Sequence, residues 1–83
     1  MQFSLTNHAS EMLEIRSIER EWIARVLEKP ILLEADQSDP SLMHALGHIP
    51  EFGDRVLRVI YNKRCTPWLV VTAYFDRTQR GKI

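Results

Sequence analysis

RVLRVIYNKRCTPWLVVTAYFDR, residues 55–77, is the stretch that decides the fold. It contains two runs of β-branched and aromatic residues, joined by a short polar turn that includes Pro67. Such runs, when bounded by turn residues, are typical of paired β-strands. We therefore predict a central hairpin with strands over Arg55–Asn62 and Pro67–Phe75, and the rest of the chain must cover it.

Two short amphipathic helices are predicted before this hairpin. The first spans Asn7–Ile15, with Thr6 or Asn7 as its N-cap residue. We expect Ser17 to cap the second helix, which ends before Pro30 because a residue that precedes proline is pushed out of the helical region. The apolar residues of the second helix recur at the spacing of one helix face, so we expect this face to pack on the sheet.

Three other segments are predicted to be extended. A short lead covers Gln2–Leu5, an alternating segment covers Ile31–Asp36, and a further candidate strand covers His44–Ile49, which Gly47 weakens. The tail over residues 76–83 is polar and basic without periodicity, and we expect it to be flexible.

The predicted fold is a single α+β domain over residues 1–83. Its element order is β-α-α-β-β-β-β, with an N-terminal helical hairpin packed on a three- to four-stranded antiparallel sheet. A chain of 83 residues has room for only one modest core. The predicted core consists of Ile18, Trp22, Ile23, Val26, Leu27, Leu57, Val59 and Val70.

Pairing of the strands predicts which side chains share a face. A turn over Pro50–Asp54 sets Ile49 opposite Arg55 and therefore Leu46 opposite Arg58. A four-residue turn over residues 63–66 would pair Arg58 with Val71. The apolar face should then meet the helices, and a partly open face should carry His44, His48, Arg58, Leu69, Val71, Ala73 and Phe75.

Composition and charge narrow the classes of function. The chain is 45% hydrophobic and 27% charged, and no apolar run approaches the roughly 20 residues of a membrane span. A single cysteine, Cys65, forms no internal disulfide, and the N-terminus lacks a secretion signal, so we expect a cytoplasmic protein without a membrane partner. Residues 1–43 carry eight acids and four bases, net −4, whereas residues 44–83 carry three acids and seven bases, net +4. Such asymmetry can orient an anionic partner toward the second half.

The three histidines do not form a metal motif. His44 and His48 are separated as a helical zinc pair would be, but on a strand they lie roughly 13 Å apart. No glycine-rich phosphate loop is present, and we predict neither a metal nor a small-molecule cofactor. His8 follows a candidate cap and is interpreted as part of the helix start.

Several short motifs resemble a bacterial domain-of-unknown-function family related to RelE/ParE and BrnT-like toxins. The resemblance runs from Asn7 to Arg77. Its motifs are H8-A9-x-x-x-L13-x-x-R16-x-I18, W22-I23-x-x-V26-L27-x-x-P30, R58-V59-I60-Y61 and V70-V71-T72-A73-Y74.

The resemblance implies a RelE-like fold and a metal-independent endoribonuclease that cleaves messenger RNA on the ribosome, or a degenerate RNA-binding relative. By the same resemblance, Arg58 and Arg77 contact substrate phosphate, His44 or His48 acts as acid or base, and an antitoxin protein is a partner. Such cleavage needs a proton acceptor, a proton donor and fixed positive charge, which histidine and arginine can supply. The chain departs from the pattern in having Met12 at a usually basic position and no aromatic residue after Arg77.

A second hypothesis comes from a different class. Arg58 would then pair with a carboxylate on a neighbouring strand, and the chain would be a non-catalytic protein-interaction module that uses an exposed sheet face or edge.

Overall fold

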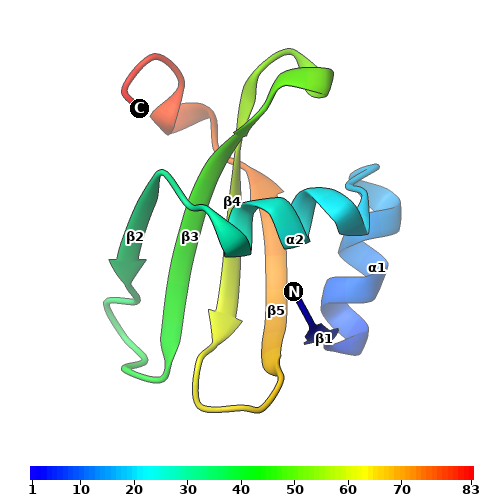
Figure 1. Ribbon diagram of the computed structural model, residues 1–83, viewed down its shortest axis with the longest axis vertical. Helices are drawn as coiled ribbons and strands as arrows, with labels where there is room; N and C mark the ends of the chain where they lie inside the picture. Colours follow the sequence, from blue (N-terminus) through cyan, green and yellow to red (C-terminus); the bar gives the residue numbers. More distant parts are fainter.

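The computed structural model describes residues 1–83 as two short helices on a five-stranded sheet (Figure 1). Figure 1 shows α2 crossing in front of the sheet and α1 lying beside β5. The elements in chain order are β1 (Phe3–Leu5), α1 (Asn7–Ile15), α2 (Arg20–Glu28), β2 (Leu32–Ala35), β3 (Leu42–Ile49), the 3₁₀ turn η1 (Pro50–Phe52), β4 (Arg55–Asn62), β5 (Trp68–Phe75) and the 3₁₀ turn η2 (Arg77–Gln79). The α+β class and the predicted element order are confirmed.

The sheet is larger and less uniform than the predicted three- to four-stranded antiparallel one. Its spatial order is β1-β5-β4-β3-β2, and β1 runs parallel to β5, with Phe3 opposite Trp68 and Leu5 opposite Val70. The other three pairings are antiparallel. A three-residue strand carries too little pattern to reveal its partner. Parallel pairing also requires a long crossover, which here contains both helices and the three remaining strands, β2, β3 and β4.

The end of α1 differs from the prediction for Ser17. Thr6 caps the helix start by accepting a hydrogen bond from the N–H of Ala9 at 3.0 Å, as predicted. At the other end, Ile18 N–H donates to the Leu13 carbonyl and Ser17 N–H donates to the Glu14 carbonyl, which is the Schellman pattern. Ser17 therefore ends α1 in the left-handed region, at φ 56°, and Glu19 is the N-cap residue of α2.

Replacing Ser17 with glycine should raise the free energy of unfolding by about 0.5–1 kcal/mol. Glycine adopts the left-handed region without the steric cost that serine has there. Chemical denaturation measures the change. The matched control is Ser10→Gly within α1, where a glycine should instead lower stability by a few tenths of a kcal/mol or more. Equal destabilisation by both substitutions would contradict the assigned role of Ser17.

The register confirms one half of the predicted pairing and corrects the other. Ile49 lies opposite Arg55 and Leu46 lies opposite Arg58, as predicted. Arg58, however, lies opposite Tyr74 and not Val71. A β-bulge follows Ile60, so that β5 has one extra residue at Val71, and six residues, 63–68, rather than four lie between the first paired residues, Asn62 and Leu69.

The corrected register moves two side chains to the helix-covered face. Ala73 is fully buried within the main core, and Phe75 packs against that core. All eight predicted core residues are buried. The complete cluster comprises Ala9, Leu13, Ile18, Trp22, Ile23, Val26, Leu27, Ala45, Ile49, Leu57, Val59, Tyr61, Val70 and Ala73.

The two sides of the sheet differ in whether other segments of the chain hydrogen-bond to their outer strands. Beyond β5, the carbonyls of Val70, Val71 and Ala73 accept hydrogen bonds from Thr6 N–H, the Thr6 hydroxyl and the Arg16 guanidinium. The β2 edge has no neighbouring element (Figure 1). No helix of the chain has the length and apolarity that crossing a bilayer requires.

Candidate functional site

Arg58 stands in the middle of β4 and is the one buried charged residue of the chain. Its Nε donates to Asp76 Oδ2 at 2.8 Å, and its Nη1 donates to Glu34 Oε1 at 3.1 Å. The Arg58 and Asp76 side chains are only 10% and 9% exposed, while Glu34 is 45% exposed. The guanidinium is thus held by carboxylates from β2 and from the residue that follows β5.

His44 extends this network toward the β2–β3 loop. Its Nδ1 lies 2.7 Å from Arg58 Nη1, and its Nε2 lies 2.7 Å from Asp36 Oδ1. Because arginine only donates hydrogen bonds, His44 Nδ1 must accept, and the ring proton must be on Nε2, where it is donated to Asp36. Both nitrogens of the imidazole are therefore occupied, and neither is free to move a substrate proton.

The charges of this group, which we call the Arg58 network, sum to a negative value. It contains one guanidinium, the carboxylates of Glu34, Asp36 and Asp76, and a neutral His44. The hydrogen bond from His44, with those from the backbone of Asp39 and Ser38, lowers the pKa of Asp36. Burial alone would raise the pKa of Asp76, but hydrogen bonds from Thr78 and Arg58 outweigh it and lower that pKa.

The predicted site residues are only partly brought together. Arg58 and His44 are in contact, as described above. His48 shares their face but donates from Nε2 to the backbone oxygen of Ile83 at 2.8 Å. Arg77 lies in η2, at the start of the segment predicted to be a flexible tail. That segment has its own contacts, since Asp76 accepts from Thr78 N–H at 2.9 Å and caps η2.

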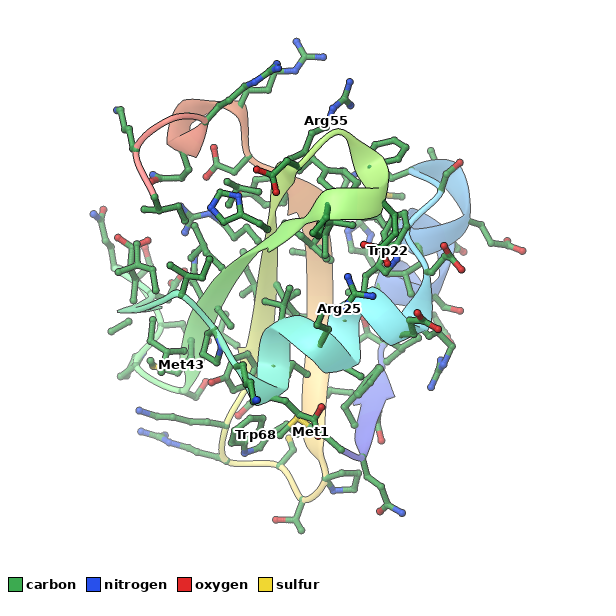
Figure 2. All side chains as sticks on the ribbon, turned by 45° about the horizontal axis from the view of Figure 1, so that its top comes forward. Met1, Trp22, Arg25, Met43, Arg55 and Trp68 are labelled. Atoms are coloured by element: carbon green, nitrogen blue, oxygen red, sulfur yellow. The ribbon has the colours of Figure 1, made fainter.

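Arg77 belongs instead to a second group, the arginine hollow, which is lined by Arg55, Arg77 and Arg80, by the wall residues Val56 and Phe75, and by Asp76. The hollow has a volume of about 250 Å³. None of its three arginines forms an ion pair, and all three are exposed. In Figure 2, Arg55 projects outward at the end of the molecule opposite Met43 and Trp68.

Aromatic rings support one side of the arginine hollow. The Phe52 and Phe75 rings are stacked, with centroids 4.8 Å apart, and the Arg55 guanidinium carbon lies 4.9 Å from the centroid of the Phe52 ring. Trp22 of α2 packs against both phenylalanines and joins them to the core. The hollow is therefore lined by two apolar side chains, three unpaired arginines and the carboxylate of Asp76, which is paired with Arg58.

Reasoning from the sequence did not select Arg55 or Arg80. Both lie outside any motif, and the signal that was available was the net charge of +4 in residues 44–83. The turn over Gly53 and Asp54, both in the left-handed region, starts β4 at Arg55. The Phe75-Asp76-Arg77 sequence ends β5 next to that start, because β4 and β5 are antiparallel.

Other candidate residues lie apart from both groups. His8 is exposed in the first turn of α1, and Cys65 is half-buried in the link between β4 and β5. The structure contains no cluster of three or more histidine, cysteine, aspartate or glutamate side chains able to hold a metal ion.

Comparison with known proteins gives one match. The family model described as a domain of unknown function, DUF4258, matches residues 5–75. No curated protein and no solved structure matches the chain. The matched range includes Arg55 and Arg58, whereas Asp76, Arg77 and Arg80 follow it.

Proposed function

The chain belongs to the DUF4258 family, whose function is unknown, and from the geometry of its charged groups we propose that it is an RNA-binding domain that holds phosphates in the arginine hollow and does not cleave RNA at Arg58. The observation that carries the proposal is the set of three unpaired arginines in a hollow whose wall includes Phe75, which stacks on Phe52. Exposed guanidinium groups bind phosphate through a planar fork of donors, and single-stranded nucleic acids also use aromatic surfaces.

The Arg58 network supports binding without cleavage. A phosphate held by Arg58 would approach Glu34 and Asp76, which lie 3.1 and 2.8 Å from the guanidinium. Repulsion between these carboxylates and the phosphate disfavours such a complex. In the arginine hollow, by contrast, one carboxylate, Asp76, stands among three unpaired arginines. His44, the predicted acid or base, is already bonded at both ring nitrogens. The toxin-like reaction that the sequence resemblance implies would require this network to open, whereas binding at the arginine hollow requires no rearrangement.

Charge distribution over the molecule agrees with this assignment. The acids concentrate in residues 1–43 and the bases in residues 44–83. The arginine hollow lies where β4 begins and β5 ends, within the basic half. An anionic chain should therefore be steered toward the hollow at low ionic strength.

Replacing Arg55, Arg77 and Arg80 together with glutamine should abolish RNA binding. We would measure fluorescence anisotropy of a labelled single-stranded RNA of about a dozen nucleotides. Three phosphate contacts predict a slope of log affinity against log salt near −2, which corresponds to a loss of roughly 16-fold between 50 and 200 mM salt. The triple variant should lose both the affinity and this salt dependence.

The matched control removes three exposed cations elsewhere, in the variant K29Q/K63Q/R64Q. This variant changes the net charge by the same amount but keeps the three arginines of the hollow. It should therefore leave most of the affinity for RNA intact. Equal losses in the two variants would indicate non-specific attraction and contradict the proposal. The absence of binding by the wild-type protein at 50 mM salt would also contradict it, and cleavage of the RNA would contradict the non-catalytic part.

A further inference from the structure

The free edge of the sheet, at β2, exposes apolar side chains that the fold leaves uncovered. Ile31 is 54% exposed and Leu33 is 51% exposed, and they are two of the four large hydrophobic residues that are exposed in the whole chain. On the other side of the sheet, β5 is covered by the short edge strand β1, Thr6 and Arg16, as described above. Natural proteins generally protect their edge strands, so an unprotected edge with exposed leucine and isoleucine indicates an interaction surface.

The backbone of β2 can accept another strand. Leu32 pairs with Leu46 and Glu34 with His44 in the antiparallel ladder to β3, and in the same register Asp36 N–H donates to the Leu42 carbonyl at 3.2 Å. In an antiparallel pair, alternate residues direct their N–H and C=O groups toward the partner. The groups of Leu33 and Ala35 therefore point away from β3, toward the open side.

The two faces of this edge have different chemistry. Leu33 lies on the face that carries the helices, because it pairs with the core residue Ala45; Ile31 precedes β2, and its N–H donates to the Leu46 carbonyl at 2.8 Å. The opposite face presents Glu34 and Asp36 beside a hollow of about 400 Å³, whose lining also includes His44 and Arg58. The Arg58 network gives this second face a net negative charge, since its three carboxylates face one guanidinium.

We propose that β2 binds an extended peptide segment of a partner protein, in which apolar residues alternate with lysine or arginine. The segment adds as a sixth strand through the outward-pointing groups of Leu33 and Ala35. An apolar side chain of the segment covers Leu33, and a basic side chain enters the hollow beside Glu34 and Asp36. Strand addition of this type takes its affinity from main-chain hydrogen bonds and its specificity from alternate side chains.

Charge complementarity selects such a peptide over a second copy of this chain. Antiparallel pairing of two β2 edges that aligns Leu33 with Ala35 would set the Glu34 side chains of the two copies directly opposite each other. Like charges at directly opposed positions destabilise a sheet. The β2 site lies on the edge strand, away from the arginine hollow, which β4, β5 and η2 form, so this inference stands independently of RNA binding.

The test uses a synthetic seven-residue peptide of alternating lysine and valine, with acetylated and amidated ends, titrated into the full chain and followed by amide chemical shifts. The matched control peptide has glutamate in place of lysine. We expect shifts confined to residues 31–36 and their β3 partners, and an affinity for the lysine peptide at least tenfold above that for the glutamate peptide. Leu33→Pro removes an outward N–H that the β3 ladder does not use, so it should abolish binding, whereas Leu33→Ala should only weaken it.

Three outcomes would overturn the inference. Equal binding of both peptides would show that the acidic face has no role, and unchanged binding by Leu33→Pro would show that the β2 edge is not used. Sedimentation that shows a dimer of the wild-type chain lost in Leu33→Pro would assign the edge to a second copy. The folding control for Leu33→Pro is its amide spectrum, which should match that of the wild-type protein outside residues 31–36.

Discussion

Replacing Arg58 with methionine is expected to lower the free energy of unfolding by about 3–5 kcal/mol, because it leaves two carboxylates without their cation. Asp76 is only 9% exposed, so its charge cannot recover full hydration once Arg58 is gone. For a domain of this size, such a loss is a large part of the total stability, which is typically about 5–15 kcal/mol. Urea denaturation followed by circular dichroism measures the change.

The matched control is Arg55→Met, on the same strand. Arg55 is exposed and forms no ion pair, so its replacement should change stability by no more than about 0.5 kcal/mol while weakening RNA binding. A second variant, in which Glu34, Arg58 and Asp76 are all replaced by apolar residues of similar volume, should recover much of the lost stability. If Arg58→Met kept wild-type stability but lost an RNA-cleaving activity or toxicity on induction, Arg58 would be a functional residue and the structural interpretation would be contradicted.

The same variant should change the response to acid. The pKa of Asp76 is lowered in the folded protein, so its contribution to stability is complete above its unfolded pKa, near 3.9, and is lost as pH falls through the lower folded value. Glu51 behaves similarly, since the hydrogen bonds from Arg25 at 2.6 and 2.8 Å lower its pKa to about 2. Without Arg58, the part of this acid-dependent loss that belongs to Asp76 should become smaller.

Leu46→Ala is expected to lower the free energy of unfolding by about 2–5 kcal/mol, the second largest effect that we predict. Leu46 has no exposed surface although it lies on the face that the helices do not cover, between Leu32 and Arg58 in the register. Truncation should therefore leave a cavity next to the Arg58 network. The matched control is Leu33→Ala on the free edge, which removes the same atoms from a side chain that is 51% exposed and should cost about 0.5 kcal/mol or less. Similar effects of the two substitutions would show that this face is open, as the sequence had suggested.

Much of the fold was predictable from local patterns. The limits of α1, the strand over residues 55–62 and the pairing of Leu46 with Arg58 follow from capping residues, β-branched runs and a short turn, all of which act over a few residues. The bulge at Val71 was not predictable in position, because nothing in a run of valine and threonine indicates where one residue is extra. This single residue decided the face of Ala73 and Phe75.

The candidate site was less predictable than the fold, because its charges depend on contacts between distant segments. Arg58 was correctly placed on the face of His44, yet its partners come from residues 24 positions before it and 18 positions after it. An arginine among valines has the same appearance in sequence whether it binds a phosphate or a carboxylate. The arginine hollow likewise joins Arg55 to Arg77 and Arg80 through the return of β5 to the start of β4.

The parallel pairing of β1 with β5 has a consequence for the order of events during synthesis on the ribosome. Strands β2 to β5 can pair through short connections as soon as each emerges, and such local contacts form rapidly. Residues 3–5 are made well before their partners, residues 68–70, have left the exit tunnel. Of the five strands, β1 is therefore the first to be synthesised and among the last to be hydrogen-bonded. Until it returns, the edge at β5 is as open to foreign strands as β2 is in the finished protein.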